Sequence, residues 1–444
     1  MRSLPPKRDG LPVLGSALSF RRDPYAFYAD VASRGDVVRF DIANVEMVAV
    51  LHPDQIEQVL VKKFDQYRKP DNAGGVEVLA DGLLLTDGER WQRQRSQLQP
   101  LFYRERVETY AETMGAYAAA AADEWCAADA PVDVADATAE YTLRVLGKTL
   151  FGIETDDRRE AVRAGARAIR ERSSDAPGAV AVPEWLPTPG NRRYRRGISQ
   201  LESVIDALLD KRESAADGDD LLSLLQAATG PDGPSEDEIR SQLATFLFAG
   251  HETSATALTW ALYELGRRPD VARQLAAEVE EVVTGEYATL AELPALEYTD
   301  RFLRETLRRY PPAAAIFRET DTAVTLGGYR LPADTFVVIP QFHVHTDDRW
   351  WNDPHRFDPS RWDSGDDSDS DRPEYAYFPF GGGPRHCIGM RFARLELKVA
   401  LATIVHRARV THDLDKVDID VGSTIQPVPE IYARFSQRSP TKTH

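Results

Sequence analysis

A ten-residue segment places one cysteine among glycines: Phe380-Gly381-Gly382-Gly383-Pro384-Arg385-His386-Cys387-Ile388-Gly389. Glycines let a backbone pass close beneath a flat ligand at angles that other residues avoid. A helix-forming run follows, and the amides at the start of a helix favour an anionic thiolate. We predict that Cys387 offers its thiolate to a large planar metal cofactor, with Phe380 shielding the sulfur and Arg385 reaching an acidic group on the cofactor edge. The alternative is a glycine-rich surface loop with an inert cysteine.

A second candidate segment, Ala249-Gly250-His251-Glu252-Thr253, lies inside a long helical run from about residue 235 to residue 267. Glycine and a threonine–serine pair are poor choices for the interior of a helix. A local rule broken in this way often marks a functional position. The alternative interpretation is an ordinary helix kink with an acid on the surface.

Two helical pairs could bind or neutralise charge. Glu305 and Arg308 are three residues apart and therefore share a helix face. Such a pair usually lies on the surface and contributes little. Trp91 and Arg95 are four residues apart, and an indole N–H beside a guanidinium suits a carboxylate. The alternative for this second pair is a core tryptophan next to an exposed arginine.

Composition excludes several classes of protein. The 444 residues include only two cysteines, which excludes a disulfide framework and a four-thiolate metal site built from this chain alone. The net charge of −17 makes duplex nucleic acid an unexpected partner. Because only nine of the 54 basic residues are lysine, we also predict adaptation to high salt, although a GC-rich genome would favour arginine as well. We expect no membrane span and no secretory signal, hence a soluble cytoplasmic protein.

The pattern of the chain predicts the elements that must position these residues. Runs at 36–40 and 46–51 predict paired strands, followed by a helix over 53–60. Most of 89–283 has helical periodicity, with a further helix at 298–310 and short strands at 324–326 and 336–339. The acidic stretch 363–371 is interpreted as a solvated loop without chemistry.

The cysteine segment matches the pattern F-x-x-G-x-R-x-C-x-G at every fixed position and resembles the signature of cytochrome P-450 haem-thiolate monooxygenases. The segment at 249–253 is similar to the oxygen-activation motif of that family. Glu-x-x-Arg at 305–308 and Pro359-Ser360-Arg361-Trp362 resemble its buried charge cluster, although many relatives have glutamate and phenylalanine at 360 and 362. His345-Thr346-Asp347-Asp348 is a second departure from the common pattern. The resemblance covers nearly the whole chain.

The resemblance implies the cytochrome P-450 fold, mainly α with small β-sheets, as one domain over residues 1–444. A β-rich part would span about 30–70, a helical body about 89–310, and a mixed part with strands, meander and cysteine loop about 311–435. A long central helix would cross over haem b, with the cysteine loop beneath it. His251 falls at a variable position of the motif and is interpreted as structural.

The resemblance also implies roles for single residues. Cys387 would be the axial ligand of the haem iron, Thr253 and Glu252 would relay protons to bound oxygen, and Ala249 and Gly250 would leave room for it. Glu305, Arg308 and Arg361 would serve folding and haem incorporation. The remaining cofactor contacts would be made by Trp91, Arg95, Arg318, Arg385, Phe380 and Gly389.

The implied reaction inserts one oxygen atom of O2 into a C–H bond of a hydrophobic small molecule, lipid-like, terpenoid or steroid-like. We expect a monomer that receives electrons from a separate ferredoxin-type partner, which docks on a basic face. That face would comprise Arg90, Arg93, Arg104, Arg106, Arg391, Arg394 and Lys398. The alternatives are a peroxygenase that uses H2O2 and a non-catalytic haem sensor or electron carrier. The predicted substrate pocket is lined by Leu84, Thr245, Phe248, Ala249, Ala315, Ile316 and Ile425.

Overall fold

The computed structural model describes residues 4–11, 13–43, 45–70, 76–155, 157–174, 186–212, 221, 224–225, 233–363 and 372–438. The predicted acidic loop falls almost entirely on 364–371 and therefore lies outside the described residues. In the part that is described, no helix is both long and apolar enough to cross a membrane.

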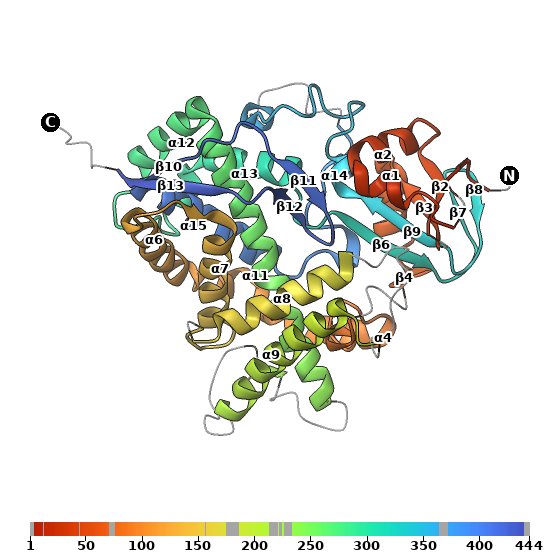
Figure 1. Ribbon diagram of the computed structural model, residues 1–444, viewed down its shortest axis with the longest axis horizontal. Coiled ribbons are helices and arrows are strands. Elements are labelled where there is room, and N and C mark those ends of the chain that lie inside the picture. Colours follow the sequence, from red (N-terminus) through yellow and green to blue (C-terminus); the bar gives the residue numbers. More distant parts are fainter. Residues whose placement is uncertain are drawn as a thin grey trace.

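Helices form most of the body, and the longest of them, α11, runs through the middle of the molecule (Figure 1). Ser235 caps its N-terminus by accepting a hydrogen bond from Glu238 N (3.2 Å), and three acidic residues in the first turn complement the helix dipole. The α-helices are α1 Ala17–Arg22, α2 Pro24–Ala32, α3 Pro53–Glu57, α4 Gly88–Leu98, α5 Arg104–Glu108, α6 Ala111–Ala127, α7 Val134–Leu150, α8 Arg159–Ser174, α9 Pro189–Arg212, α11 Glu236–Arg267, α12 Pro269–Val282, α13 Glu297–Arg309, α14 Gln341–Val344 and α15 Met390–Arg407.

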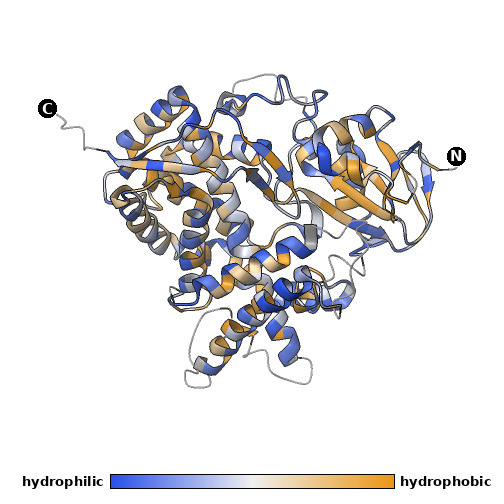
Figure 2. Ribbon diagram, in the orientation of Figure 1, coloured by the Kyte–Doolittle hydropathy of each residue, from blue (hydrophilic) through white to orange (hydrophobic). Residues whose placement is uncertain are grey.

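A six-stranded mixed sheet lies on the side of the molecule that holds α1 and α2, opposite α6, α12 and α15 (Figure 1). Its strands, in spatial order, are β1 Lys7–Arg8, β2 Val37–Ile42, β3 Val45–Val50, β9 Phe336–Pro340, β6 Ala315–Thr320 and β4 Tyr67–Arg68. The pairs β1–β2 and β3–β9 are parallel and the other neighbours are antiparallel. The central strands are mostly hydrophobic (Figure 2), as expected for strands covered on both faces.

Three smaller sheets complete the fold. One has the order β10 Ala408–Thr411, β13 Tyr432–Gln437 and β5 Val132–Asp133; the two hairpins are β7 Val324–Leu326 with β8 Tyr329–Leu331 and β11 Asp418–Val421 with β12 Ile425–Val428. The result is a mainly helical protein with small β-sheets, as predicted. The strands expected at 36–40, 46–51, 324–326 and 336–339 and the helices expected at 235–267 and 298–310 all form, with small shifts of their ends. The helix expected over 53–60 continues instead as a π-helical segment, Gln58–Lys62, after Glu57.

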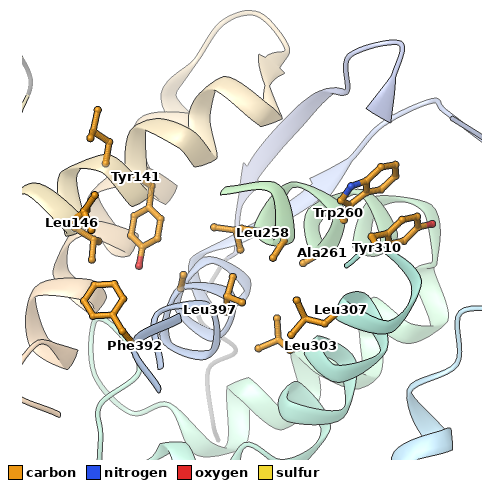
Figure 3. Packing of buried hydrophobic residues seen from close by; sticks show 14 of the residues in the cluster. Tyr141, Leu146, Leu258, Trp260, Ala261, Leu303, Leu307, Tyr310, Phe392 and Leu397 are labelled. Atoms are coloured by element: carbon orange, nitrogen blue, oxygen red, sulfur yellow. The ribbon is translucent and has the colours of Figure 1, made fainter. Parts of the chain in front are cut away.

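The core fills the space between α7, α11, α13 and α15 (Figure 3). Trp260 of α11 stacks on Tyr310 with ring centroids 4.0 Å apart, which fastens the end of α13 to the central helix. Leu303 and Leu307 of α13 point into the same space (Figure 3). Because α15 starts directly after the cysteine loop, its packing on α11 fixes the loop relative to the central helix.

Candidate functional site

The cysteine loop approaches the π-helical segment that follows α3. Cys387 N donates to the Phe380 carbonyl at 2.8 Å, which closes the loop. Gly383 has a positive φ of 64°, and a Cβ built on it would lie only 1.9 Å from the Leu60 carbonyl oxygen. Glycine is therefore required at position 383 by both conformation and space.

The surroundings of Cys387 act on its thiol in two opposite directions. Its side chain is accessible to solvent, yet burial raises the pKa of the thiol. The Gly389 N–H and the charge of Arg95 act in the opposite direction and favour the thiolate. This combination suits a ligand that ionises when it binds a metal.

Helix α4 meets the loop through the predicted Trp91 and Arg95. Arg95 Nη1 donates to the His386 carbonyl at 2.9 Å. The Arg385 guanidinium carbon lies 4.4 Å from the centre of the Trp91 ring, and Arg385 forms an ion pair with Asp87, the N-cap residue of α4. The helix and the loop are thus joined by cationic side chains.

Three cations gather at this edge of the site around one carboxylate. Arg318 and Arg385 both act electrostatically on Lys69, Arg385 also acts on Arg318, and Asp87 is the one acid that acts on all three in the described part of the chain. Burial, with Arg385 adding to it, lowers the pKa of Arg318 to about 10. Burial and both arginines lower the pKa of Lys69 well below its usual value. Buried like charges require a counter-charge.

With Lys69 in its charged form, the three cations exceed Asp87 by two charges, which would match the two propionate carboxylates of haem b. Arg318 and Arg385 were predicted for that role, and the structure brings them together. Sequence reasoning missed Lys69, because nothing local distinguishes it from other lysines; only the pairing of β4 with β6 brings it beside Arg318. It also missed Asp87, whose place as a helix cap was the available signal.

Helix α11 carries the predicted relay residues. Thr253 Oγ1 donates to the Ala249 carbonyl at 2.9 Å, four residues earlier. Glu252 is buried and forms an ion pair with Arg170 of α8, with 2.5 Å between Oε1 and Nη1. Gln426 Nε2 lies 3.4 Å from the same carboxylate oxygen. Sequence reasoning missed Arg170 and Gln426, because both are distant in the chain and occur in no motif.

Two neighbours of these residues have packing reasons of their own. A Cβ on Gly250 would lie 2.9 Å from Leu146 Cδ1, so glycine there lets Leu146 of α7 pack closely without a shift of its side chain. His251 is buried, and its Nδ1 is hydrogen-bonded to the Leu247 carbonyl. The Thr142 hydroxyl of α7 donates to the backbone carbonyl of His251 at 3.2 Å. Burial lowers the pKa of His251. The structure thus places His251 against α7 as a structural residue.

The charge cluster predicted from Glu305, Arg308 and Arg361 comes together in the core. Arg308 binds Glu305 with two parallel bonds of 2.8 Å, and both side chains are fully buried. Arg361 Nε lies 3.4 Å from Glu305 Oε1. Trp362, a departure from the common pattern, donates its indole N–H to Glu305 Oε2 at 3.1 Å. The departure therefore adds a donor to the cluster.

The segment 345–348, which also departs from the common pattern of the family, is stabilised by contacts of its own side chains. His345 Nε2 accepts the backbone N–H of Phe378 at 2.9 Å, and burial lowers its pKa to about 3, so that the ring stays neutral. Asp347 pairs with Arg349 at 2.6 Å. His345 thus anchors the segment that leads into the cysteine loop.

The predicted pocket residues differ in burial. Ile316 Cδ1 lies 3.6 Å from a Cβ built on Gly381, so its side chain points toward the cysteine loop. Thr245 donates to the Ser241 carbonyl at 2.7 Å and lies against Gly82. Among the predicted pocket residues, Leu84 is exposed, and Ala249, Ala315 and Ile316 are half-buried. The buried ones are Thr245, Phe248 and Ile425.

Comparisons with known proteins agree with this arrangement. The family model described as Cytochrome P450 matches residues 5–433. Cyclooctatin synthase from Streptomyces melanosporofaciens is 36% identical over 425 residues, which cover 90% of this chain and 88% of the relative. Cyclooctat-9-en-7-ol 5-monooxygenase from the same species is 33% identical over 427 residues, 92% of this chain and 91% of the relative. Pentalenene oxygenase from Streptomyces avermitilis is 33% identical over 420 residues, 91% of each chain. With a cysteine loop that Arg95 and Arg385 join to helix α4, the chain belongs to the cytochrome P450 family, whose members bind haem b and act as monooxygenases.

Proposed function

We propose that this monooxygenase hydroxylates a C–H bond of a hydrophobic terpenoid. Of the three substrate classes expected from the sequence, the terpenoid class is supported by the compounds in the names of two similar proteins, pentalenene and cyclooctat-9-en-7-ol. Apolar side chains among the predicted pocket residues, such as Phe248 and Ile316, agree with a substrate of this kind.

The observation that carries the assignment is the solvent-accessible Cys387 thiol in a loop that Arg95 and Arg385 join to helix α4. Cys387 would ligate the iron of haem b, and Lys69, Arg318 and Arg385 would bind its propionates. Bound in this way, haem b supplies the chemistry by which O2, two electrons and two protons yield water and one inserted oxygen atom. Phe380 and the loop backbone would shield the sulfur from water.

Thr253 and Glu252 would move protons on the opposite side of the site. The Thr253 hydroxyl has to release the Ala249 carbonyl before it can donate elsewhere, which costs about 1 kcal/mol, the net value of one hydrogen bond. Glu252 is held by Arg170 and is therefore fixed in position until that ion pair opens. These two contacts would therefore control where the side chains lie and when each can pass on a proton.

The absorption spectrum of the reduced, CO-bound protein tests the ligand assignment. We expect a red-shifted Soret band that Cys387→Ser abolishes and that Cys126→Ser, at the only other cysteine, leaves in place. A Soret band in the ordinary blue-side position for the intact, folded protein would contradict the assignment.

The substrate class and the oxidant need separate measurements. Spectral shifts on adding terpenoids, fatty acids and steroids should be largest for a terpenoid. Hydroxylated product should require O2 with a reductant and an electron-transfer protein, whereas equal turnover with H2O2 alone would favour a peroxygenase. Absence of product under every condition would favour a haem sensor or electron carrier.

The electron donor is proposed to be an acidic ferredoxin. Arg391 and Arg394 are exposed at the start of α15, and no acidic side chain lies within ion-pair distance of either in the described residues. Arg90 and Arg93, expected on the same face, instead pair with Glu238 of α11, so they contribute less free charge. Docking should therefore depend mainly on the arginines of α15.

Charge reversal tests this docking face. Arg394→Glu should slow reduction by ferredoxin several-fold at low salt, because rim charges act mainly on the association rate. Arg273→Glu, an exposed arginine on α12, serves as the control. Equal reduction rates for both variants would exclude the arginines of α15 as the docking face.

The single domain with its three parts, the monomeric state, the cytoplasmic location and the adaptation to high salt stay predictions. An acidic surface adapted to salt should give a higher melting temperature in molar KCl than in dilute buffer. Sedimentation at several concentrations would determine the oligomeric state.

A further inference from the structure

Five large apolar side chains are exposed on the turn before α1, on α1 itself and at the start of β3, elements that lie at one end of the molecule (Figure 1). Val13 is 73% exposed, and the others are 39–55% exposed. The two segments that carry them are joined because Ala43 N donates to the Leu14 carbonyl at 3.0 Å. We call this set the apolar patch; it comprises Leu11, Val13, Leu14, Leu18 and Val45.

The fold holds this patch outward. Leu11 and Gly15 exchange two backbone hydrogen bonds of 2.8 Å, and Val13 lies in the turn between them. The φ of Val13 is 67°, a conformation that is unfavourable for a β-branched residue. An exposed valine in a strained turn has no explanation within the isolated chain, whereas the other exposed leucines, such as Leu186 and Leu290, are far from one another in the chain.

The patch lies within a basic part of an otherwise acidic protein. Residues 1–22 contain five basic residues and one acidic residue, while the whole chain has a net charge of −17. Arg21 and Arg22 are exposed at the end of α1, and within the described residues neither has an acidic partner. Lys7, by contrast, pairs with Asp41 at 2.8 Å. Leu18 and Arg22 are four residues apart and therefore share a helix face.

Apolar side chains beside unpaired arginines are the combination that binds the interface of an anionic bilayer. The apolar groups enter the boundary of the acyl chains, and the guanidinium groups remain among the lipid phosphates. Because the protein carries a net charge of −17, an anionic surface repels most of its other faces and favours a basic one. We propose that the apolar patch, with Arg21 and Arg22, docks the protein on an anionic lipid surface without crossing it.

Co-sedimentation of the holoprotein with vesicles tests this inference. Vesicles of phosphatidylglycerol and phosphatidylcholine in equal parts should bind the protein, and vesicles of phosphatidylcholine alone should bind it more weakly. Val13→Ser/Leu14→Ser should reduce binding by about tenfold or more, because two apolar side chains no longer enter the lipid. Arg21→Glu/Arg22→Glu should remove the preference for anionic vesicles and its salt dependence.

The control is Leu186→Ser/Leu290→Ser, which removes two exposed leucines outside the patch and should bind like the parent protein. An unchanged CO spectrum would show that each variant is folded. Absence of binding to the anionic vesicles, or equal binding by Val13→Ser/Leu14→Ser, would overturn the proposal. A dimer in light scattering that the same variant abolishes, without vesicle binding, would instead assign the patch to a second copy of the chain. None of these readouts depends on the substrate proposed above.

Discussion

Arg170 of α8 lies 2.5 Å from Glu252 of α11, so that the acid beside Thr253 is bound to a different helix. The Glu252 side chain is only 10% exposed and the Arg170 side chain 29% exposed, which places the pair between a surface ion pair and a buried one. Movement of α8 would therefore break a contact of the proposed proton relay. The position of α8 and the freedom of Glu252 are linked.

A double-mutant cycle should measure this link. Arg170→Gln, Glu252→Gln and the double variant, compared by urea unfolding, should give a coupling of about 1 kcal/mol, more than most exposed pairs show. The exposed pair Arg104–Glu108, 2.6 Å apart, is the control and should give a coupling close to zero. Equal coupling for the two pairs would show that solvent screens Glu252 as completely as it screens a surface acid.

Glu396 should make stability depend on pH. This side chain of α15 is fully buried, its oxygens lack a hydrogen bond of ordinary geometry, and burial raises its pKa from 4.5 to about 8, opposed by the Ser254 hydroxyl. Below pH 4.5 both the folded and the unfolded states hold the proton. As the pH rises to 8, the unfolded state ionises first, so folding loses roughly 3–5 kcal/mol in that window.

Glu396→Gln should remove this loss, because an amide does not titrate. Its free energy of unfolding relative to the parent protein should therefore increase steadily between pH 5 and pH 8, measured in urea. A difference that does not change with pH would mean that Glu396 is ionised in the folded protein.

Lys69→Met should have opposite effects with and without haem. Without haem, removing one of three neighbouring cations relieves repulsion and should raise the free energy of unfolding by about 0.5–1 kcal/mol. With haem, a propionate loses a partner, so transfer of haem to a scavenging protein should become faster. Lys62→Met, seven residues earlier and paired with Glu57, should change neither quantity. A loss of stability in the haem-free protein would show that Lys69 has a counter-charge of its own.

Glu305→Gln should destabilise the protein strongly. Arg308 is fully buried and Arg361 lies beside it, so loss of the carboxylate leaves two cations without a counter-charge. Breaking a buried pair in this way typically costs about 3–5 kcal/mol. The melting temperature and the haem content of the purified protein should both fall. Glu108→Gln at the exposed pair should leave both unchanged.

The sequence predicted what depends on local pattern. The period of apolar residues defined α11, and alternation defined β2 and β3, because these signals lie within the segments themselves. The π-helical continuation of α3 was not predictable, since its geometry comes from packing against the cysteine loop.

The residues of the site also fall into two groups, those that stand in a sequence motif and those that only folding brings together. Cys387 and the pair Glu305–Arg308 stand in motifs whose spacing is visible in the chain. Lys69, Arg170 and Gln426 do not, because each meets its partner through folding: Arg170 reaches Glu252 across 82 positions of sequence. Charge pairs between distant elements leave no periodic signal, so electrostatic partners were the part of the site that sequence reasoning missed.

The contact between Gly250 and Leu146 has a consequence for how such enzymes diverge. With only 2.9 Å between a Cβ at position 250 and Leu146 Cδ1, the two positions are sterically interdependent. A side chain at 250 therefore needs a shift of the Leu146 side chain, a smaller residue at 146, or a wider separation of α7 and α11. These two positions should therefore covary among homologues, and libraries designed to change substrate preference should vary them together.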